Sequence, residues 1–177
     1  MCASTARLSE NHGRDTALPA AGVAFRPTRG ADLDAVLPRL ASRTLREIDR
    51  YLCDFPSDAR LANVRAHVEA ATQAGRADTF LLNDRPVGII THTPENDYFY
   101  TTALPTEAYF SKAFLKLSRR YNDALVRRLR RELRAYSRSD HSETASWFRL
   151  MGFTEIGSDG DARVFVYPIT ETESSST

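Results

Sequence analysis

The sequence predicts an α/β domain in which a mixed β-sheet carries helices on both faces. In the first part of the chain, four short segments of strand-like composition alternate with two segments whose apolar residues recur at helical spacing. The pattern then indicates a long helix, a strand, a short helix and a closing hairpin. The chain has 177 residues, of which 42% are hydrophobic, so it is long enough for one domain with a sizeable core.

The two ends of the chain differ from the region between them. Residues 1–22 are small, polar and without periodicity, which predicts a disordered N-terminal arm, either solvated or ordered against a neighbour in an assembly. Residues 171–177 predict a disordered C-terminal tail. A single folded domain is therefore expected over residues 23–170.

Four strands are expected in the first half of the domain. They cover residues 23–26, 79–82, 87–91 and 98–103. The sequence Asn83-Asp84-Arg85-Pro86 predicts the turn of a hairpin between the second and third of them. His92 stands at the end of the third strand, where it could face a cleft or be a capped or solvated histidine.

Two helices are predicted among these strands. The first starts at Asp32, and its apolar residues recur at helical spacing as far as Ile48. Pro38 lies inside this pattern, so the helix is expected to kink or restart there. The second helix follows a turn at residues 56–58 and ends at Gly75. Its apolar side is formed by Leu61, Val64, Val68 and Ala71, and His67 is expected on the rim of this helix rather than as a base.

A long basic amphipathic helix is predicted over residues 106–129, followed by a strand over residues 133–137. The inward side of this helix is formed by Phe110, Phe114, Leu117, Tyr121, Ala124 and Leu125. The other faces carry a basic stripe, which consists of Lys112, Lys116, Arg119, Arg120, Arg127, Arg128 and Arg131. Such a stripe is either a solvated outer face or a docking surface for phosphates or an acidic partner.

The last segment is predicted to be a short helix followed by a hairpin. Ser139 or Asp140 can cap this helix, and Gly152 can end it as a left-handed residue. Its inward face is formed by Ala145, Phe148, Leu150 and Met151. Strands are expected at residues 153–156 and 162–169, with a turn at residues 157–160.

Composition and charge exclude several classes of protein. The net charge of +1 gives no global field that would attract nucleic acid or a membrane surface. The two cysteines, Cys2 and Cys53, show neither a disulfide framework nor metal-ligand spacing, so no metal site is predicted. No apolar run reaches the length of a membrane span, and the first residues lack the apolar core of a secretory signal.

The segment Ala145-x-x-Phe148-x-x-x-Gly152-Phe153, preceded by a strand and a polar cap, resembles the last motif of the GNAT superfamily of N-acetyltransferases. In element order the resemblance covers residues 23–169. It implies a GNAT-like mixed, mostly antiparallel central sheet of about six to seven strands.

A closer resemblance is to the acetyltransferase-like internal virion proteins of short-tailed phages. It rests on three segments, Tyr98-Phe99-Tyr100-Thr101-Thr102, Phe114-Leu115-Lys116-Leu117-Ser118-Arg119-Arg120 and the ending from Trp147 to Phe153.

The GNAT resemblance implies a cradle for the diphosphate of acetyl-CoA at the start of the long helix, with the pattern Gln/Arg-x-x-Gly-x-Gly/Ala. At the predicted helix start the chain has Leu104-Pro105 followed by the candidate cofactor-binding residues Thr106, Glu107, Ala108 and Tyr109. This turn contains no glycine, Pro105 lacks an N–H donor, and Glu107 adds a negative charge. On these grounds no cofactor is expected.

The resemblance also implies a tyrosine, four residues before the Gly-Phe pair, that protonates the leaving thiolate. The residue at this position is Phe148, which has no hydroxyl group. Catalytic candidates are Glu95, His92 and Tyr136, and Asp97 and Glu155 are further candidates for a general base.

The resulting hypothesis is a non-enzymatic, GNAT-like structural or assembly protein of a tailed-phage virion. Its partners would be portal, tail or internal virion proteins, and it would be found in the virion and, during assembly, in the host cytoplasm. The alternative is an acetyl-CoA-dependent N-acetyltransferase with a divergent diphosphate loop. A third hypothesis is a nucleic-acid-binding module that uses the basic stripe.

Overall fold

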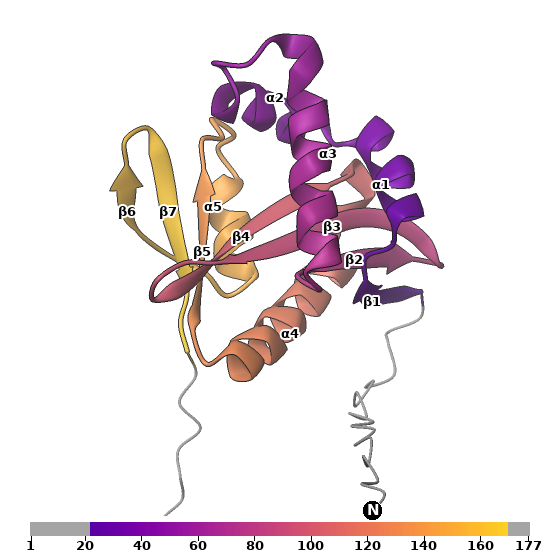
Figure 1. Cartoon of the computed structure of the whole chain (residues 1–177). Coiled ribbons are helices and arrows are strands. Elements are labelled where there is room, and N and C mark those ends of the chain that lie inside the picture. Colours follow the sequence, from indigo (N-terminus) through magenta and orange to yellow (C-terminus); the bar gives the residue numbers. More distant parts are fainter. Residues whose placement is uncertain (1–21, 170–177) are drawn as a thin grey trace, which may run out of the picture.

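The computed structural model describes residues 22–169, which form one seven-stranded sheet with the strand order β1-β2-β3-β4-β5-β7-β6 (Figure 1). In chain order, the elements are β1 (Val23–Pro27), α1 (Gly30–Val36), η1 (Leu37–Arg39), α2 (Ser42–Tyr51), α3 (Ser57–Gln73), β2 (Ala77–Leu82), β3 (Arg85–Pro94), β4 (Tyr98–Pro105), η2 (Glu107–Tyr109), α4 (Lys112–Leu129), β5 (Glu132–Ser137), α5 (Thr144–Leu150), β6 (Thr154–Asp159) and β7 (Ala162–Tyr167), where η marks a 3-10 helix. The predicted mixed, mostly antiparallel sheet is confirmed, because only β4 and β5 pair in parallel. The predicted arm, apart from Gly22, and the predicted tail lie outside the described residues.

Helices cover both faces of the sheet, as predicted (Figure 1). On one face, Ile89 and Leu104 pack in a core with Leu33 of α1 and Val68 of α3. On the other face, aromatic side chains of the sheet pack against α4 and α5. This second core contains Phe80, Phe114, Tyr121, Leu125, Leu133, Phe153 and Phe165. Outside the register shifts near Phe80 and Glu155, side chains alternate between the two faces along each strand, so this division assigns strand residues to the α1–α3 side or to the α4–α5 side.

Strands β4 and β5 separate soon after they meet. They pair only where Tyr98–Tyr100 lie beside Glu132–Arg134. Beyond this point β4 remains paired with β3 as far as Pro105, whereas β5 pairs with β7. The sheet is therefore split between β4 and β5, and Figure 1 shows β5, β7 and β6 turning away from β3 and β4.

The start of the domain is fixed by a buried ion pair. The carboxylate of Asp32 is 3% exposed and accepts hydrogen bonds from both terminal nitrogens of Arg26, at 2.6 and 2.8 Å. It also accepts from the Thr79 hydroxyl and from the backbone N–H of Arg29, the N-cap of α1. The predicted break at Pro38 is confirmed, because a 3-10 turn there separates α1 from α2.

The long helix begins at Lys112 and not at residue 106, so the predicted start was wrong. Two anchors hold the intervening residues away from the helix. The N–H and the hydroxyl of Thr106 both donate to the carbonyl of Val87, at 2.9 and 2.8 Å. Tyr109 is buried against Phe114, and Ser111 is extended, with φ −124° and ψ 159°. The backbone before α4 is therefore held in the core at Thr106 and Tyr109, and the helix starts only at Lys112.

The short helix α5 begins at Thr144 rather than at Ser139 or Asp140. Asp140 instead forms an ion pair with Arg50, and the Ser139 hydroxyl accepts a hydrogen bond from Thr144 Oγ1 at 3.0 Å. These contacts use the side chains that were expected to cap the helix, so that prediction was wrong.

Gly152 ends α5 with φ +95°, as predicted. A Cβ at this position would lie 2.6 Å from Cε2 of Tyr167, so no other residue fits without displacing that ring.

Five smaller predictions were wrong. Leu61, Ala124 and Leu150 were expected to face inward, but Ala124 is exposed and Leu61 and Leu150 are 41% and 57% exposed. The turn expected at residues 157–160 is shorter, because β6 continues past a bulge near Gly157 as far as Asp159. The last strand ends at Tyr167 rather than at residue 169.

Candidate active site

A cavity of about 520 Å³ lies where β4 and β5 separate. Its walls come from α2 and α3 on one side of the sheet and from η2, α4 and α5 on the other. Tyr100 to Pro105 of β4 and Ala135 to Ser137 of β5 contribute the strand residues at the gap. The split sheet thus creates a cavity that reaches both faces.

Glu47 of α2 is the acid of the cavity wall on the α2–α3 side. One of its carboxylate oxygens accepts a hydrogen bond from the backbone N–H of Arg138 at 2.9 Å. Burial raises the pKa of Glu47, because desolvation outweighs the hydrogen bonds from Ser137 and Arg138 that favour the charged form. A half-buried carboxylate with a raised pKa, held at a cavity wall, has the properties of a general base.

Glu47 was not among the candidate residues predicted from the sequence. The available signal was its position in the helix, because Thr44, Ile48 and Tyr51 lie three or four residues apart and face the interior. An acid among these residues is placed on the inward face of α2.

Three tyrosines surround the same half of the cavity. Tyr100 of β4 and Tyr136 of β5 have ring centroids 5.5 Å apart in an edge-to-face arrangement. The hydroxyl of Tyr51 is buried and has no hydrogen-bond partner within residues 22–169. Burial raises the pKa of Tyr51 and of Tyr100, so both are neutral at physiological pH. The catalytic candidate Tyr136 is therefore in the cavity wall.

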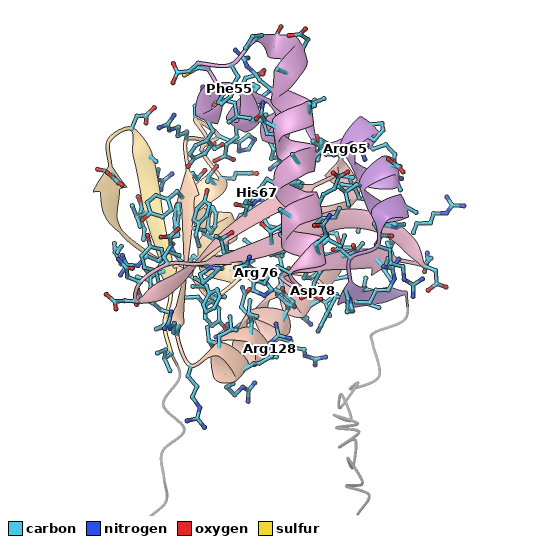
Figure 2. The ribbon with its side chains drawn as sticks, in the orientation of Figure 1. Phe55, Arg65, His67, Arg76, Asp78 and Arg128 are labelled. Carbon is cyan, nitrogen blue, oxygen red and sulfur yellow. The ribbon has the colours of Figure 1, made fainter. Side chains whose placement is uncertain are left out.

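His67 also borders the cavity. It lies on the side of α3 that faces the sheet, and its Nε2 is 3.2 Å from the Thr91 hydroxyl (Figure 2). Burial lowers the pKa of His67, so the ring is neutral at pH 7.

The α4–α5 side of the cavity is mainly aromatic. Phe110 packs edge-to-face on Trp147, with ring centroids 5.2 Å apart, and the guanidinium of Arg43 lies 4.0 Å above the Phe110 ring. Thr101 of β4 is buried in the wall, and its hydroxyl has no hydrogen-bond partner within residues 22–169. Phe148 stacks on Phe165 at 4.0 Å. The nearby hydroxyls of Ser139 and Thr144 also line the cavity.

The four predicted cofactor-binding residues have varied environments. Thr106 and Tyr109 are buried, and Tyr109 donates to or accepts from the Ser118 hydroxyl at 2.7 Å. Ala108 is exposed in η2. The Glu107 carboxylate accepts the backbone N–H of Ser42 at 3.1 Å, in the first turn of α2, so this acid caps α2 and does not begin α4.

The N-terminus of α4 is formed by Ser111-Lys112-Ala113. The helix has no side-chain cap, and the N–H groups of its first turn have no acceptor within the helix. Small residues flank a lysine here, and no acid lies in the first turn. The objections raised by Pro105 and Glu107 therefore do not apply to this helix start.

The other predicted catalytic residues lie outside the cavity wall. His92 is 2% exposed, beneath α4 and beside Phe99, and burial lowers its pKa to about 4. Glu95 and Asp97 are exposed near the β3–β4 turn. Glu155 forms an ion pair with Arg163 at 2.6 Å on the edge hairpin.

The residues of the basic stripe are all exposed. Within residues 22–169 none of them forms an ion pair with an acidic side chain. Two of them bond backbone carbonyls instead, Arg127 to Asp123 and Arg131 to Glu95. In the described part of the chain, no helix combines the length and hydropathy of a membrane span, and no cluster of side chains has the composition of a metal site.

No protein-family model and no curated protein matches the sequence. Solved acetyltransferases match the structure. A GNAT-family acetyltransferase from Bacillus anthracis has a TM-score of 0.63 at 11% identity, covering 86% of this chain and 98% of that one. An acetyltransferase from Agrobacterium tumefaciens has a TM-score of 0.64 at 19% identity, covering 85% and 93%.

PaiA N-acetyltransferase from Thermoplasma acidophilum, solved in complex with coenzyme A, has a TM-score of 0.63 at 12% identity, covering 81% of this chain and 97% of that one. The fold is therefore that of the GNAT acetyltransferases, as the resemblance implied. The three structures named here are acetyltransferases, and the finer resemblance to internal virion proteins stays a prediction.

Proposed function

We propose that this chain is an acetyl-CoA-dependent N-acetyltransferase that acetylates an amine. The observation that carries the proposal is the carboxylate of Glu47, which has a raised pKa and lies in the cavity between β4 and β5. The fold supports it, because structural neighbours are acetyltransferases and one of them was solved with coenzyme A.

The residues around the α4–α5 side fit a coenzyme A molecule. The free N–H groups at the start of α4 and the Lys112 ammonium can hold a diphosphate, since a helix N-terminus favours anions. On β4, the unpartnered hydroxyl of Thr101 can bond an amide of the pantetheine arm. Acetyl-CoA, when bound, supplies an acetyl group activated as a thioester.

Glu47 would act on the acceptor amine from the α2–α3 side. An ammonium group loses two protons when it becomes an amide, as the N–C bond forms and the thioester C–S bond breaks. Glu47 takes one proton and passes it to solvent, and the other ends on the thiol product, so atoms and charge balance. Burial raises the pKa of Glu47 toward the working pH, and a base whose pKa is near the working pH transfers protons more efficiently.

The hydroxyls of Ser139 and Thr144, before and at the start of α5, would carry the second proton. Thr144 Oγ1 donates to Ser139 Oγ at 3.0 Å, and both residues line the cavity. Phe148 cannot take part, because its ring has no exchangeable proton. We therefore assign Ser139 and Thr144 as a relay between solvent and the departing sulfur.

Calorimetric titration with acetyl-CoA tests the proposal directly. A 1:1 complex and a rise in melting temperature are expected, with ATP as the control nucleotide that shares the diphosphate but lacks the pantetheine arm. Mass spectrometry of an amine mixture incubated with acetyl-CoA should show products heavier by one acetyl group. If acetyl-CoA neither binds nor raises the melting temperature, the proposal is wrong and the non-enzymatic hypothesis gains.

A further inference from the structure

The α2–α3 half of the cavity holds one carboxylate in a mainly aromatic and aliphatic wall, to which α2 and α3 also contribute the neutral polar residues Thr44, Asn63 and His67. Glu47 supplies the acid, and Tyr51, Tyr100 and Tyr136 supply the rings. Ile48, Leu52 and Val64 add aliphatic side chains from α2 and α3. The described residues that line the whole cavity include no second Asp or Glu.

Within residues 22–169 no arginine or lysine forms an ion pair with Glu47, and the nearby charge of Arg50 only opposes the rise in the pKa of Glu47. Arg43 is the only arginine or lysine among the described lining residues, and its guanidinium lies 4.0 Å above the Phe110 ring. The Arg138 guanidinium lies 4.6 Å from the centroid of the Tyr51 ring and 2.9 Å from Asp161, and it is not among the lining residues. Glu47 is therefore free to pair with a cation of a ligand.

Building on the proposed function, we propose that the acceptor is a small primary amine carried by an aromatic group. Its ammonium would pair with the Glu47 carboxylate. It would also donate a hydrogen bond to the Tyr51 hydroxyl, which has no partner within residues 22–169. Its ring would pack against the pair formed by Tyr100 and Tyr136, whose rings already contact each other edge-to-face at 5.5 Å. Tyrosine faces near the carboxylate also favour a cation.

The same wall disfavours polyamines, aminoglycosides and protein lysines. Each additional ammonium group of such an acceptor would lose water on entering the cavity and find no second acid there. A lysine on a protein surface would also bring polar backbone groups to an apolar wall. The composition of the cavity thus selects for one charge and one apolar body.

The test measures acetyl transfer from acetyl-CoA to 2-phenylethylamine, tyramine, tryptamine, spermidine and a lysine-containing peptide. We expect kcat/KM for the three aromatic amines to exceed that for spermidine and the peptide by at least tenfold. Preference for spermidine or the peptide would overturn this inference while leaving the proposed function intact.

Two variants connect the preference to the cavity. Tyr100→Ala should lower kcat/KM at least tenfold for the aromatic amines, mainly through KM, and should change the rate for spermidine far less. Phe55→Ala is the matched control, because Phe55 is 45% exposed on the loop after α2 (Figure 2) and lies outside the cavity wall. Equal losses for aromatic amines in both variants would overturn the inference.

Direct binding separates this inference from the proposed function. Calorimetry of wild-type protein with 2-phenylethylamine, in the presence and absence of coenzyme A, should detect binding that Tyr100→Ala weakens at least tenfold. If neither titration shows binding at millimolar amine while acetyl-CoA still binds, the aromatic-amine inference is wrong and the transferase proposal stands.

Discussion

The carboxylate of Glu47 accepts the backbone N–H of Arg138 at 2.9 Å, which joins α2 to the residue that follows β5. This hydrogen bond fixes the direction of the acid without neutralising it. A glutamine at position 47 can keep the same bond through its amide oxygen. The relationship therefore allows the chemistry of the acid to be tested separately from its structural role.

Glu47→Gln should lower kcat/KM for acetyl transfer about 10²-fold to 10⁴-fold, the usual contribution of a general base. The affinity for acetyl-CoA should not change. In the wild type, kcat/KM should rise with pH as Glu47 loses its proton, at a pH above the ordinary glutamate pKa, because burial raises its pKa. This limb of the pH profile should disappear in the variant.

Glu69→Gln is the control for this substitution, because Glu69 is a solvent-facing acid on α3 whose carboxylate lies 3.6 Å from Arg65. It should leave kcat/KM within a factor of two. An unchanged pH profile in Glu47→Gln would remove Glu47 from the mechanism.

The start of α4 offers a test of cofactor binding. Ala113→Glu places a carboxylate in the first turn of the helix, beside the N–H groups assigned to the diphosphate. Like charge should weaken acetyl-CoA binding by about 1.4 kcal/mol, which is roughly tenfold in Kd. An acid in the first turn stabilises a helix, so lost folding would not explain the loss of affinity.

Ala124→Glu is the matched control, because Ala124 is exposed in the middle of the same helix. Calorimetry should give this variant the wild-type Kd. Equal effects of the two substitutions would indicate a general charge effect and contradict the assigned diphosphate site.

Local sequence signals predicted most of the fold because they report on short-range physics. A proline inside a helix breaks or kinks it, as Pro38 does between α1 and α2. Gly152 adopts a left-handed conformation, and the Tyr167 ring leaves no room for a Cβ there. The start of α4 could not be predicted in this way. It depends on Thr106 and Tyr109 being held by Val87 and Phe114, which are contacts between different elements.

The candidate site was harder to predict than the fold. Tyr136 was named as a catalytic candidate from the sequence, and it lines the cavity. Glu47 and Tyr51 were missed because helical spacing can place them on the inward face of α2 but cannot show that α2 lies at the split between β4 and β5. Glu107 was placed at the diphosphate because the helix start was misplaced, and its contact with Ser42 appears only in three dimensions.

Two aspartates of α1 provide a stability test. Asp32→Ala removes the partner of Arg26 in a site where Asp32 is 3% exposed, and the hydrogen bonds from Thr79 and Arg29 are lost too. The free energy of unfolding should fall by about 3 kcal/mol. Asp34→Ala breaks the surface pair with Arg65, in which the Asp34 side chain is 69% exposed, and should cost less than about 1 kcal/mol. Urea denaturation of both variants measures the difference, and similar losses would contradict the importance of burial.

His92 makes stability depend on pH. Burial is the main cause of its low pKa of about 4, nearby Asp78 opposes the shift, and Arg128 and Arg76 add to it. Asp78 also accepts a hydrogen bond from Tyr121 at 2.9 Å. Figure 2 shows Arg76, Asp78 and Arg128 in the part of the molecule that contains β2 and α4. A proton on His92 is therefore disfavoured in the folded protein relative to an exposed histidine.

The sign follows from the difference between the two states. Between pH 6.5, the ordinary histidine pKa, and pH 4, the unfolded chain binds a proton at residue 92 that the folded chain does not. The contribution of neutral His92 is fully present above pH 6.5 and is lost as the pH falls toward 4, by about 3 kcal/mol in total. His92→Gln removes the titrating group, so its free energy of unfolding should fall less between pH 7 and pH 4.5 than that of the wild type. Urea denaturation at the two pH values measures this fall in each protein. If the free energy of unfolding falls equally in the wild type and in His92→Gln, His92 does not carry the dependence, because the remaining acids, including Asp32, titrate in both proteins.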